Sequence, residues 1–372
     1  MKRFFNILLT AIAMLFMIAI GSTCGFLISY ALMSTQYQIY EKIFFIAGLL
    51  FAGYLSIILH EVGHLICGLI SGYRFSSFRI AGLMWIKQDG KIKLCRHSIV
   101  GTGGQCLMLP PENNQENPPV VLYNLGGVIA NVILTAVYSL CIYLLWGNHL
   151  ICSVFIISAV LSLIIAITNG IPMNISGFAN DGMNALHLSK DPVAARTFLA
   201  QLQMSAAQAS GIRISDMPDE WFAIPENADM QNIHIASIAV FSASRALDRL
   251  DTLSAEKEIG SLLARNANII GLHKNLLKCD LVFARLINKG KEAEISSLLT
   301  LEQLKFMKSM SSYPSILRTE YAIALIRDND ESTAEKIRSK FDKIAKKYPY
   351  TADIVAEREM LDYVFEVHKK QI

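Results

Sequence analysis

The sequence predicts a mainly α-helical protein that combines a polytopic membrane core with a helical water-soluble domain. The chain of 372 residues is 53% hydrophobic and only 17% charged, whereas a soluble domain usually carries about 25% charged residues. The charges are also unevenly placed. No Lys, Arg, Asp or Glu occurs from Val120 to Asn180, and basic and acidic residues are equally numerous from Met183 onward. The first half is therefore typical of a membrane protein and the second half of a soluble domain.

Four apolar segments are long enough to cross a bilayer, which takes roughly 20 helical residues. They are Phe4–Met33, Ile43–Ile70, Val120–Trp146 and Leu150–Thr168. The first segment is longer than the apolar region of a signal peptide, so we interpret it as a retained anchor.

The positive charges on the connecting loops predict how these spans are oriented. Lys2 and Arg3 precede the first span, and the segment Ser71–Pro119 carries more Lys and Arg than the other connections between spans. Cytoplasmic loops are enriched in these residues. We therefore expect both termini and this segment on the cytoplasmic side of a membrane that we interpret as a bacterial plasma membrane.

Between the second and third spans, the pattern indicates a small β element on the cytosolic side. The runs Leu83–Lys87 and Lys91–Cys95 flank Asp89-Gly90, and Asp-Gly between such runs is a strong hairpin signal. The hairpin could be purely structural. Alternatively, Gly101–Leu109 could form an edge strand that captures an extended substrate segment.

Helix signals follow one another in the second half of the chain. Thr300–Gln303 and Ser332–Glu335 have the pattern of capping boxes, and we expect a last helix over Thr351–Lys369. Residues Ala324–Pro349 loosely resemble one tetratricopeptide unit, with a compact helical bundle as the alternative. Either kind of domain could recruit a protein partner.

Together these features predict three domains. We expect an N-terminal anchor with a short extracytoplasmic loop at 1–42, a membrane core at 43–182 with a β-rich segment at 71–119, and a helical cytosolic domain at 183–372. No basic run is long enough to indicate binding of nucleic acid, so we expect no nucleic-acid partner.

The second span ends with the motif H-E-x-x-H, at His60, Glu61 and His64. Residues four apart lie on one face of a helix, so both imidazoles can reach a single Zn²⁺ ion, and Glu61 can take a proton from bound water. A charged side chain at the centre of a span costs about 2.5–3.5 kcal/mol and usually marks function. Because catalytic zinc usually has three protein ligands, we expect Asp181, just after the fourth span, to be the third, with His187 as the alternative.

The order of these motifs resembles the site-2 protease family of intramembrane zinc metalloproteases. That family combines H-E-x-x-H with a later Asp-Gly that follows an N-x-x-P pattern, matched here by Asp181-Gly182 and Asn169–Pro172. Its G-x-x-x-N pattern in the intervening span is matched by Gly127–Asn131. The resemblance covers roughly Ile43 to Gly182. The spacing from Asn169 to Asp181 is longer than usual in the family, so residues 174–177 look like part of an insertion.

The resemblance implies a role for each matching residue. His60, His64 and Asp181 would bind Zn²⁺, and Glu61 would act as the general base. Asn131 and Asn169 would hydrogen-bond the substrate backbone or the oxyanion, although Asn residues in spans also commonly join helices to one another. The implied substrate is a membrane-spanning protein or a hydrophobic peptide in the lipid bilayer.

A non-catalytic membrane scaffold whose helical domain recruits partners is the alternative function. The intact Glu61 favours the enzyme, because a scaffold needs no general base.

Overall fold

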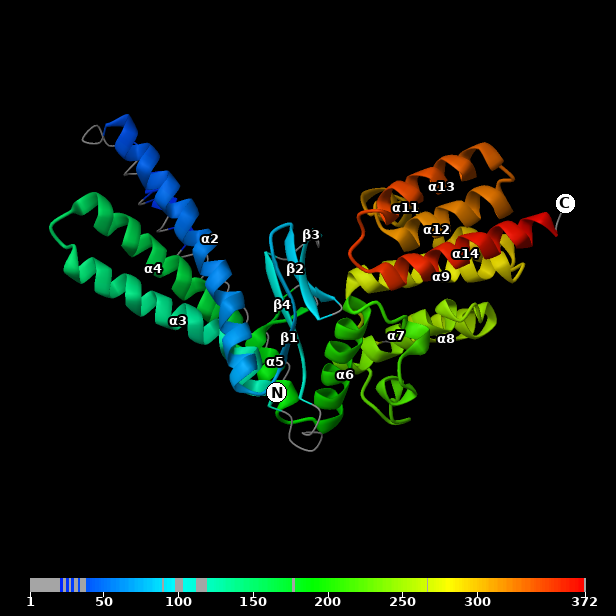
Figure 1. The fold of residues 1–372 in the computed structure, drawn as a ribbon, viewed down its shortest axis with the longest axis horizontal. Helices are drawn as coiled ribbons and strands as arrows, with labels where there is room; N and C mark the ends of the chain where they lie inside the picture. Colours follow the sequence, from blue (N-terminus) through cyan, green and yellow to red (C-terminus); the bar gives the residue numbers. More distant parts are fainter. Residues whose placement is uncertain are drawn as a thin grey trace. The chain divides into compact units, whose positions relative to one another are not determined.

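The structure is a computed structural model that describes residues 38–88, 90–97, 103–111, 119–175, 178–265 and 267–370, with a few residues between 21 and 33 (Figure 1). The first predicted span, Phe4–Met33, lies largely outside the described residues. The chain forms two compact units. The membrane unit contains the described residues of Met1–Arg74, Gly101–Cys106 and Glu116–Lys190, and the C-terminal unit contains those of Phe75–Val100, Leu107–Gln115 and Asp191–Ile372. Most of the predicted β-rich segment thus groups with the C-terminal helices.

The membrane unit is built on three long apolar helices, α2 (Ile39–Ile70), α3 (Val120–Leu144) and α4 (His149–Gly170). Each is long and apolar enough to cross a membrane, and they are the three such helices among the described residues. They coincide with the second, third and fourth predicted spans. Helix α3 packs against both α2 and α4, so the helix that carries the H-E-x-x-H motif lies directly against the helix that carries the G-x-x-x-N motif.

A small hairpin follows α4 and leads into the helix α5 (Asp181–Leu188). Strands β5 (Asn174–Ile175) and β6 (Phe178–Ala179) pair antiparallel. Beyond the hairpin, the backbone N–H of Asn180 donates to the carbonyl oxygen of Met173 at 3.1 Å. This hydrogen bond brings the residue before Asp181 back to the segment that follows α4.

The connection between α2 and α3 contains a four-stranded sheet in the order β3-β2-β1-β4. Its strands are β1 (Arg74–Ile80), β2 (Leu83–Gln88), β3 (Lys91–Arg96) and β4 (Gly104–Leu109). Strand β2 pairs antiparallel with both β1 and β3, which confirms the predicted hairpin. Its turn includes Gly90 at a φ of 74°, a conformation that glycine adopts without strain.

Beyond the strands that group with it, the C-terminal unit is a set of packed helices, shown in green to red in Figure 1. They are α6 (Pro192–Ala209), α7 (Ile233–Asp248), α8 (Thr252–Ala264), α9 (Gly271–Ile287), α10 (Glu292–Leu298), α11 (Leu301–Ser309), α12 (Pro314–Ala322), α13 (Glu331–Ala345) and α14 (Thr351–Lys369). The predicted last helix is confirmed. Thr300 caps α11 as predicted, since its side chain accepts from the N–H of Gln303. The prediction placed the cap of α13 at Ser332, which is two residues too late. The observed cap is Asp330, whose carboxylate accepts from the N–H of Thr333.

One apolar core joins helices that are far apart in sequence. Phe283 of α9, Leu317 of α12, Phe341 of α13 and Val364 of α14 are all fully buried in the same cluster. In a solenoid each repeat contacts only its neighbours, whereas here α12 packs against α9, α13 and α14. The helical character of this part of the chain is therefore as predicted, but the resemblance to a tetratricopeptide unit is not confirmed.

Candidate metal centre

Three side chains converge near the end of α2 that we predict to be cytosolic. His60 and His64 lie one turn apart on α2, and Asp181 is the first residue of α5. The Nε2 atoms of the two histidines are 3.2 Å apart, and they lie 3.1 and 3.4 Å from Asp181 Oδ2. Ligands about 2.0–2.1 Å from a tetrahedral Zn²⁺ ion are separated by about 3.3 Å. The spacing of the three donor atoms therefore fits zinc.

The surroundings of Asn131 fix which nitrogen of His60 carries the proton. The Asn131 amide nitrogen donates to the carbonyl oxygen of Ser56 at 3.1 Å and to Ser162 Oγ at 3.2 Å. Because the Ser56 carbonyl can only accept, the amide oxygen of Asn131 must face His60, and it lies 2.6 Å from Nδ1. We infer that Nδ1 of His60 is the donor, which leaves a lone pair on Nε2.

His64 is held in the same tautomer. Its Nδ1 lies 2.8 Å from the carbonyl oxygen of Tyr123 on α3, and this oxygen can only accept a hydrogen bond. In the neutral form of both imidazoles, the two Nε2 atoms thus present lone pairs to each other and to the carboxylate of Asp181. Three acceptors this close, with no hydrogen between them, are stabilised by a cation. The donor set and its supporting hydrogen bonds fit a zinc site.

Two glycines allow the helices to approach closely enough for this convergence. A Cβ atom on Gly127 of α3 would lie 2.5 Å from the ring of His60, so no other residue fits at this position without moving the ligand. A Cβ atom on Gly182 would overlap the carbonyl oxygen of Gly170 at the end of α4. The glycines of the G-x-x-x-N and Asp-Gly motifs therefore have a direct steric role in forming the site.

Glu61 lies beside the cluster on the partly exposed side of α2. A Cβ atom on Gly104, at the start of β4, would lie 2.7 Å from Glu61 Oε1. The carboxylate therefore runs along the backbone of β4, in a place where this strand has no side chain to block it. Because Glu61 is not fully buried, water can reach it.

Asn180 holds Asp181 in position, and the sequence analysis did not identify it. Its amide oxygen accepts from the N–H groups of Met173 and Met183, and its amide nitrogen donates to the carbonyl oxygens of Thr168 and Ile171. The side chain thus ties the end of α4 to the start of α5. The one available signal was that Asn is a favoured residue immediately before a helix.

The remaining predicted residues lie in different surroundings. Asn131 is fully buried, and its hydrogen bonds join α2, α3 and α4. This matches the alternative prediction, in which the side chain joins helices rather than binding a substrate. Asn169 is partly buried and donates to the carbonyl oxygen of Ile165 in its own helix at 3.0 Å. His187 is exposed on α5. Among the residues that the structure describes, the metal-type donors that cluster are His60, His64 and Asp181.

Comparison with known proteins agrees with this geometry. No curated protein and no solved structure matches the chain significantly. Residues 44–344 match Peptidase family M50, and this match covers the three apolar helices, the metal centre and most of the C-terminal unit. The chain therefore belongs to Peptidase family M50, the site-2 protease family that the order of its motifs resembles.

Proposed function

We propose that this integral membrane protein is a zinc metalloendopeptidase that hydrolyses peptide bonds within or next to a membrane-spanning segment. The single observation that carries the proposal is the convergence of His60, His64 and Asp181, with both histidine Nδ1 atoms hydrogen-bonded away from the cluster. Membership of a peptidase family supports the reaction class, and the three apolar helices support a site at the membrane.

In this proposal, His60, His64 and Asp181 hold the metal. When bound, zinc would supply Lewis-acid chemistry and lower the pKa of a coordinated water to about 7. Glu61 takes the proton from the attacking water as the new C–O bond forms. It then gives this proton to the leaving amine as the C–N bond breaks, so that the carboxylate is regenerated.

Asn131 and Tyr123 have a positioning role in the same scheme. The Asn131 side chain and the Tyr123 carbonyl orient the two imidazoles. Orienting groups of this kind also raise the basicity of the ligating nitrogen. We therefore assign Asn131 to the support of His60 and keep Asn169 as the candidate contact to the substrate backbone.

The substrate class follows from the location of the centre. The ligands lie on and beside helices that are long and apolar enough to span a bilayer, so the substrate is a membrane-spanning protein or a hydrophobic peptide. We place both termini in the cytoplasm, from the distribution of Lys and Arg, and we propose that the C-terminal unit selects protein partners.

The proposal is tested with Glu61→Gln in the full-length protein. This variant should retain zinc, measured by mass spectrometry of the purified protein, but should lose about 10²–10⁴-fold in activity. Membranes of cells that carry the variant should accumulate an uncut spanning peptide that is absent from wild-type membranes. His64→Ala should lose both zinc and cleavage.

Glu41→Gln is the matched control, because Glu41 lies on the same helix in the first turn, far from the metal centre. It should behave as the wild type. If Glu61→Gln leaves the membrane peptides and the cellular function unchanged, the chain is a scaffold and the proposal fails.

A further inference from the structure

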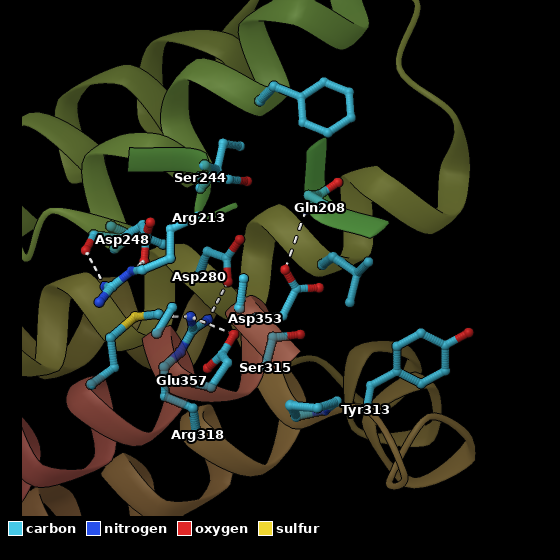
Figure 2. Close-up of a pocket in the computed structure, with 18 of the residues that line it drawn as sticks. Gln208, Arg213, Ser244, Asp248, Asp280, Tyr313, Ser315, Arg318, Asp353 and Glu357 are labelled. Carbon is cyan, nitrogen blue, oxygen red and sulfur yellow. Dashed lines mark hydrogen bonds and ion pairs between the residues drawn. The ribbon is translucent and has the colours of Figure 1, made fainter. Parts of the chain in front are cut away.

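The C-terminal unit contains a cavity of about 270 Å³ that lies among α6, α7, α9, α12 and α14 (Figure 2). It takes no part in the metal centre, because its lining residues fall between Gln208 and Met360. Besides His273 and two tyrosines, several charged side chains line it. They are Arg213, Asp248, Asp280, Arg318, Asp353 and Glu357.

One ion pair in this cavity is already complete. Asp248 accepts hydrogen bonds from Arg213 Nη2 and from the backbone N–H of Ser215, both at 2.8 Å. This carboxylate is buried, and it shares Arg213 with the exposed Glu359, whose Oε2 lies 2.7 Å from Arg213 Nη1. Asp248 is therefore already paired.

Two of the other carboxylates, Asp280 and Glu357, share a single cation. Arg318 is fully buried on α12 and donates to Asp280 and, at 3.3 Å, to Glu357 Oε1 (Figure 2). Asp353 receives a hydrogen bond from the neutral amide of Gln208 at 3.3 Å. Two carboxylates thus share one guanidinium group and a third has only a neutral partner, so this part of the cavity has an excess of negative charge.

Glu357 shows this excess most directly. The residue is 8% exposed, and its Oε2 atom is buried without a hydrogen-bond partner among the described residues. A buried acceptor without a partner costs about 1–3 kcal/mol. Burial raises the pKa of Glu357 to about 7 and that of Asp353 to about 6. The two carboxylates lie four residues apart, on one face of α14.

The rest of the lining indicates what kind of cation fits. Phe241, Leu276, Leu277 and Met360 provide apolar surface, which suits a carbon chain rather than a hydrated metal ion. Among the described residues, three metal-type donor atoms lie within 4.8 Å of one another at the metal centre, but not in this cavity.

We propose that this cavity binds an organic cation, an ammonium or guanidinium group on an apolar stem, with Asp353 and Glu357 as its counter-ions. The cation would supply the donor that Glu357 Oε2 lacks, and its stem would lie against the apolar lining. Such a group is found on a basic side chain of a peptide and on a free organic amine.

The test uses the full-length protein in detergent at pH 8 and isothermal titration calorimetry. The probes are butylguanidinium as the free cation, an acetylated Gly-Arg-Gly amide as the peptide, and butylurea as the uncharged analogue of the first. The proposal expects saturable binding of at least one charged probe and none of butylurea. Binding of the peptide alone identifies a peptide side chain as the source, and binding of butylguanidinium shows that a free cation suffices.

Two variants separate this site from general charge effects. Asp353→Asn combined with Glu357→Gln keeps the shape of the cavity and should weaken the binding by about 10-fold or more. Glu366→Gln is the matched control, since this exposed residue of the same helix pairs with Lys369, and its affinity should equal that of the wild type. Circular dichroism verifies that each variant is folded.

Four results would overturn the proposal. The charged probes could show no saturable binding, butylurea could bind as tightly as butylguanidinium, or the double variant could keep the wild-type affinity. Saturable binding of Ca²⁺ alone, competed by no organic cation, would identify an inorganic ion site and would equally contradict the proposal.

Discussion

Replacing Asn131 with Ala should weaken zinc binding even though Asn131 is not a ligand. The substitution removes the acceptor that lies 2.6 Å from His60 Nδ1. The proton on Nδ1 would then be buried without a partner, because the surroundings of Asn131 exclude solvent. His60 could rotate or change tautomer, and either change would turn the lone pair of Nε2 away from His64 and Asp181.

The size of the effect follows from two independent arguments. Loss of a group that orients a metal ligand typically lowers the metal affinity by about 10–100-fold, which corresponds to about 1.4–2.7 kcal/mol. A buried donor left without an acceptor costs about 1–3 kcal/mol. Since the two ranges overlap, we expect the dissociation constant for zinc to rise by about 10–100-fold in Asn131→Ala.

The assay is a titration of the purified protein against a chromophoric zinc chelator at pH 7.5. Asn124→Ala is the matched control: Asn124 is also a buried residue of α3, and its amide donates to the carbonyl oxygen of Val120 in its own helix. Equal zinc affinity in Asn131→Ala and wild type would refute the proposed support of His60. Equal losses in both Asn variants would show that the effect comes from helix packing.

Three further outcomes follow from the structure. Gly127→Ala should lose zinc, because its Cβ atom would lie 2.5 Å from the His60 ring. Gly147 has open space around it, so Gly147→Ala should bind zinc as the wild type does. The zinc content of both variants is measured by mass spectrometry. Asn180→Ala removes a helix cap worth about 1 kcal/mol and the hydrogen bonds that tie α5 to α4. Its unfolding midpoint and its zinc affinity should therefore both fall. An unchanged zinc affinity would show that Asn180 does not support the metal centre. For Glu357, burial raises the pKa to about 7, so the folded protein keeps a proton that the unfolded chain releases near its usual pKa. The free energy of unfolding should therefore fall as the pH rises from about 4.5 to 7, by up to about 3 kcal/mol, and urea unfolding of Glu357→Gln should show a smaller decrease over this range than the wild type.

The parts of the metal centre that depend on helix periodicity could be predicted from the sequence. His60 and His64 lie four residues apart, so one turn of a single helix brings their rings together whatever the rest of the chain does. The long apolar helices were predictable for a similar reason, since length and composition alone decide whether a helix can span a bilayer.

The residues that hold the metal ligands in place could not be predicted in the same way. Whether Asn131 contacts a substrate or His60 depends on the rotation of α3 against α2, and a run of apolar residues does not encode this rotation. The role of Asn180 depends on the hairpin β5–β6 closing before α5, so that Thr168 and Ile171 come within reach of one side chain. Both roles arise from tertiary contacts between segments that local patterns describe separately.

The buried charges of the cavity in the C-terminal unit could not be predicted from local sequence patterns either. Asp280 and Glu357 lie on the buried faces of α9 and α14, where a helical pattern alone would predict apolar residues. A sequence shows such residues only as interruptions of an apolar face, and it does not show that Arg318 comes between them. In the membrane unit, hydrogen bonds hold the Nδ1 atoms of His60 and His64, so that three donor atoms remain that a metal can take up. In the C-terminal unit Glu357 pairs with Arg318 through Oε1, and its Oε2 is among the buried atoms without a hydrogen-bond partner in the described residues. Because a buried carboxylate is costly unless it is protonated or fully paired, this cavity favours a positively charged ligand.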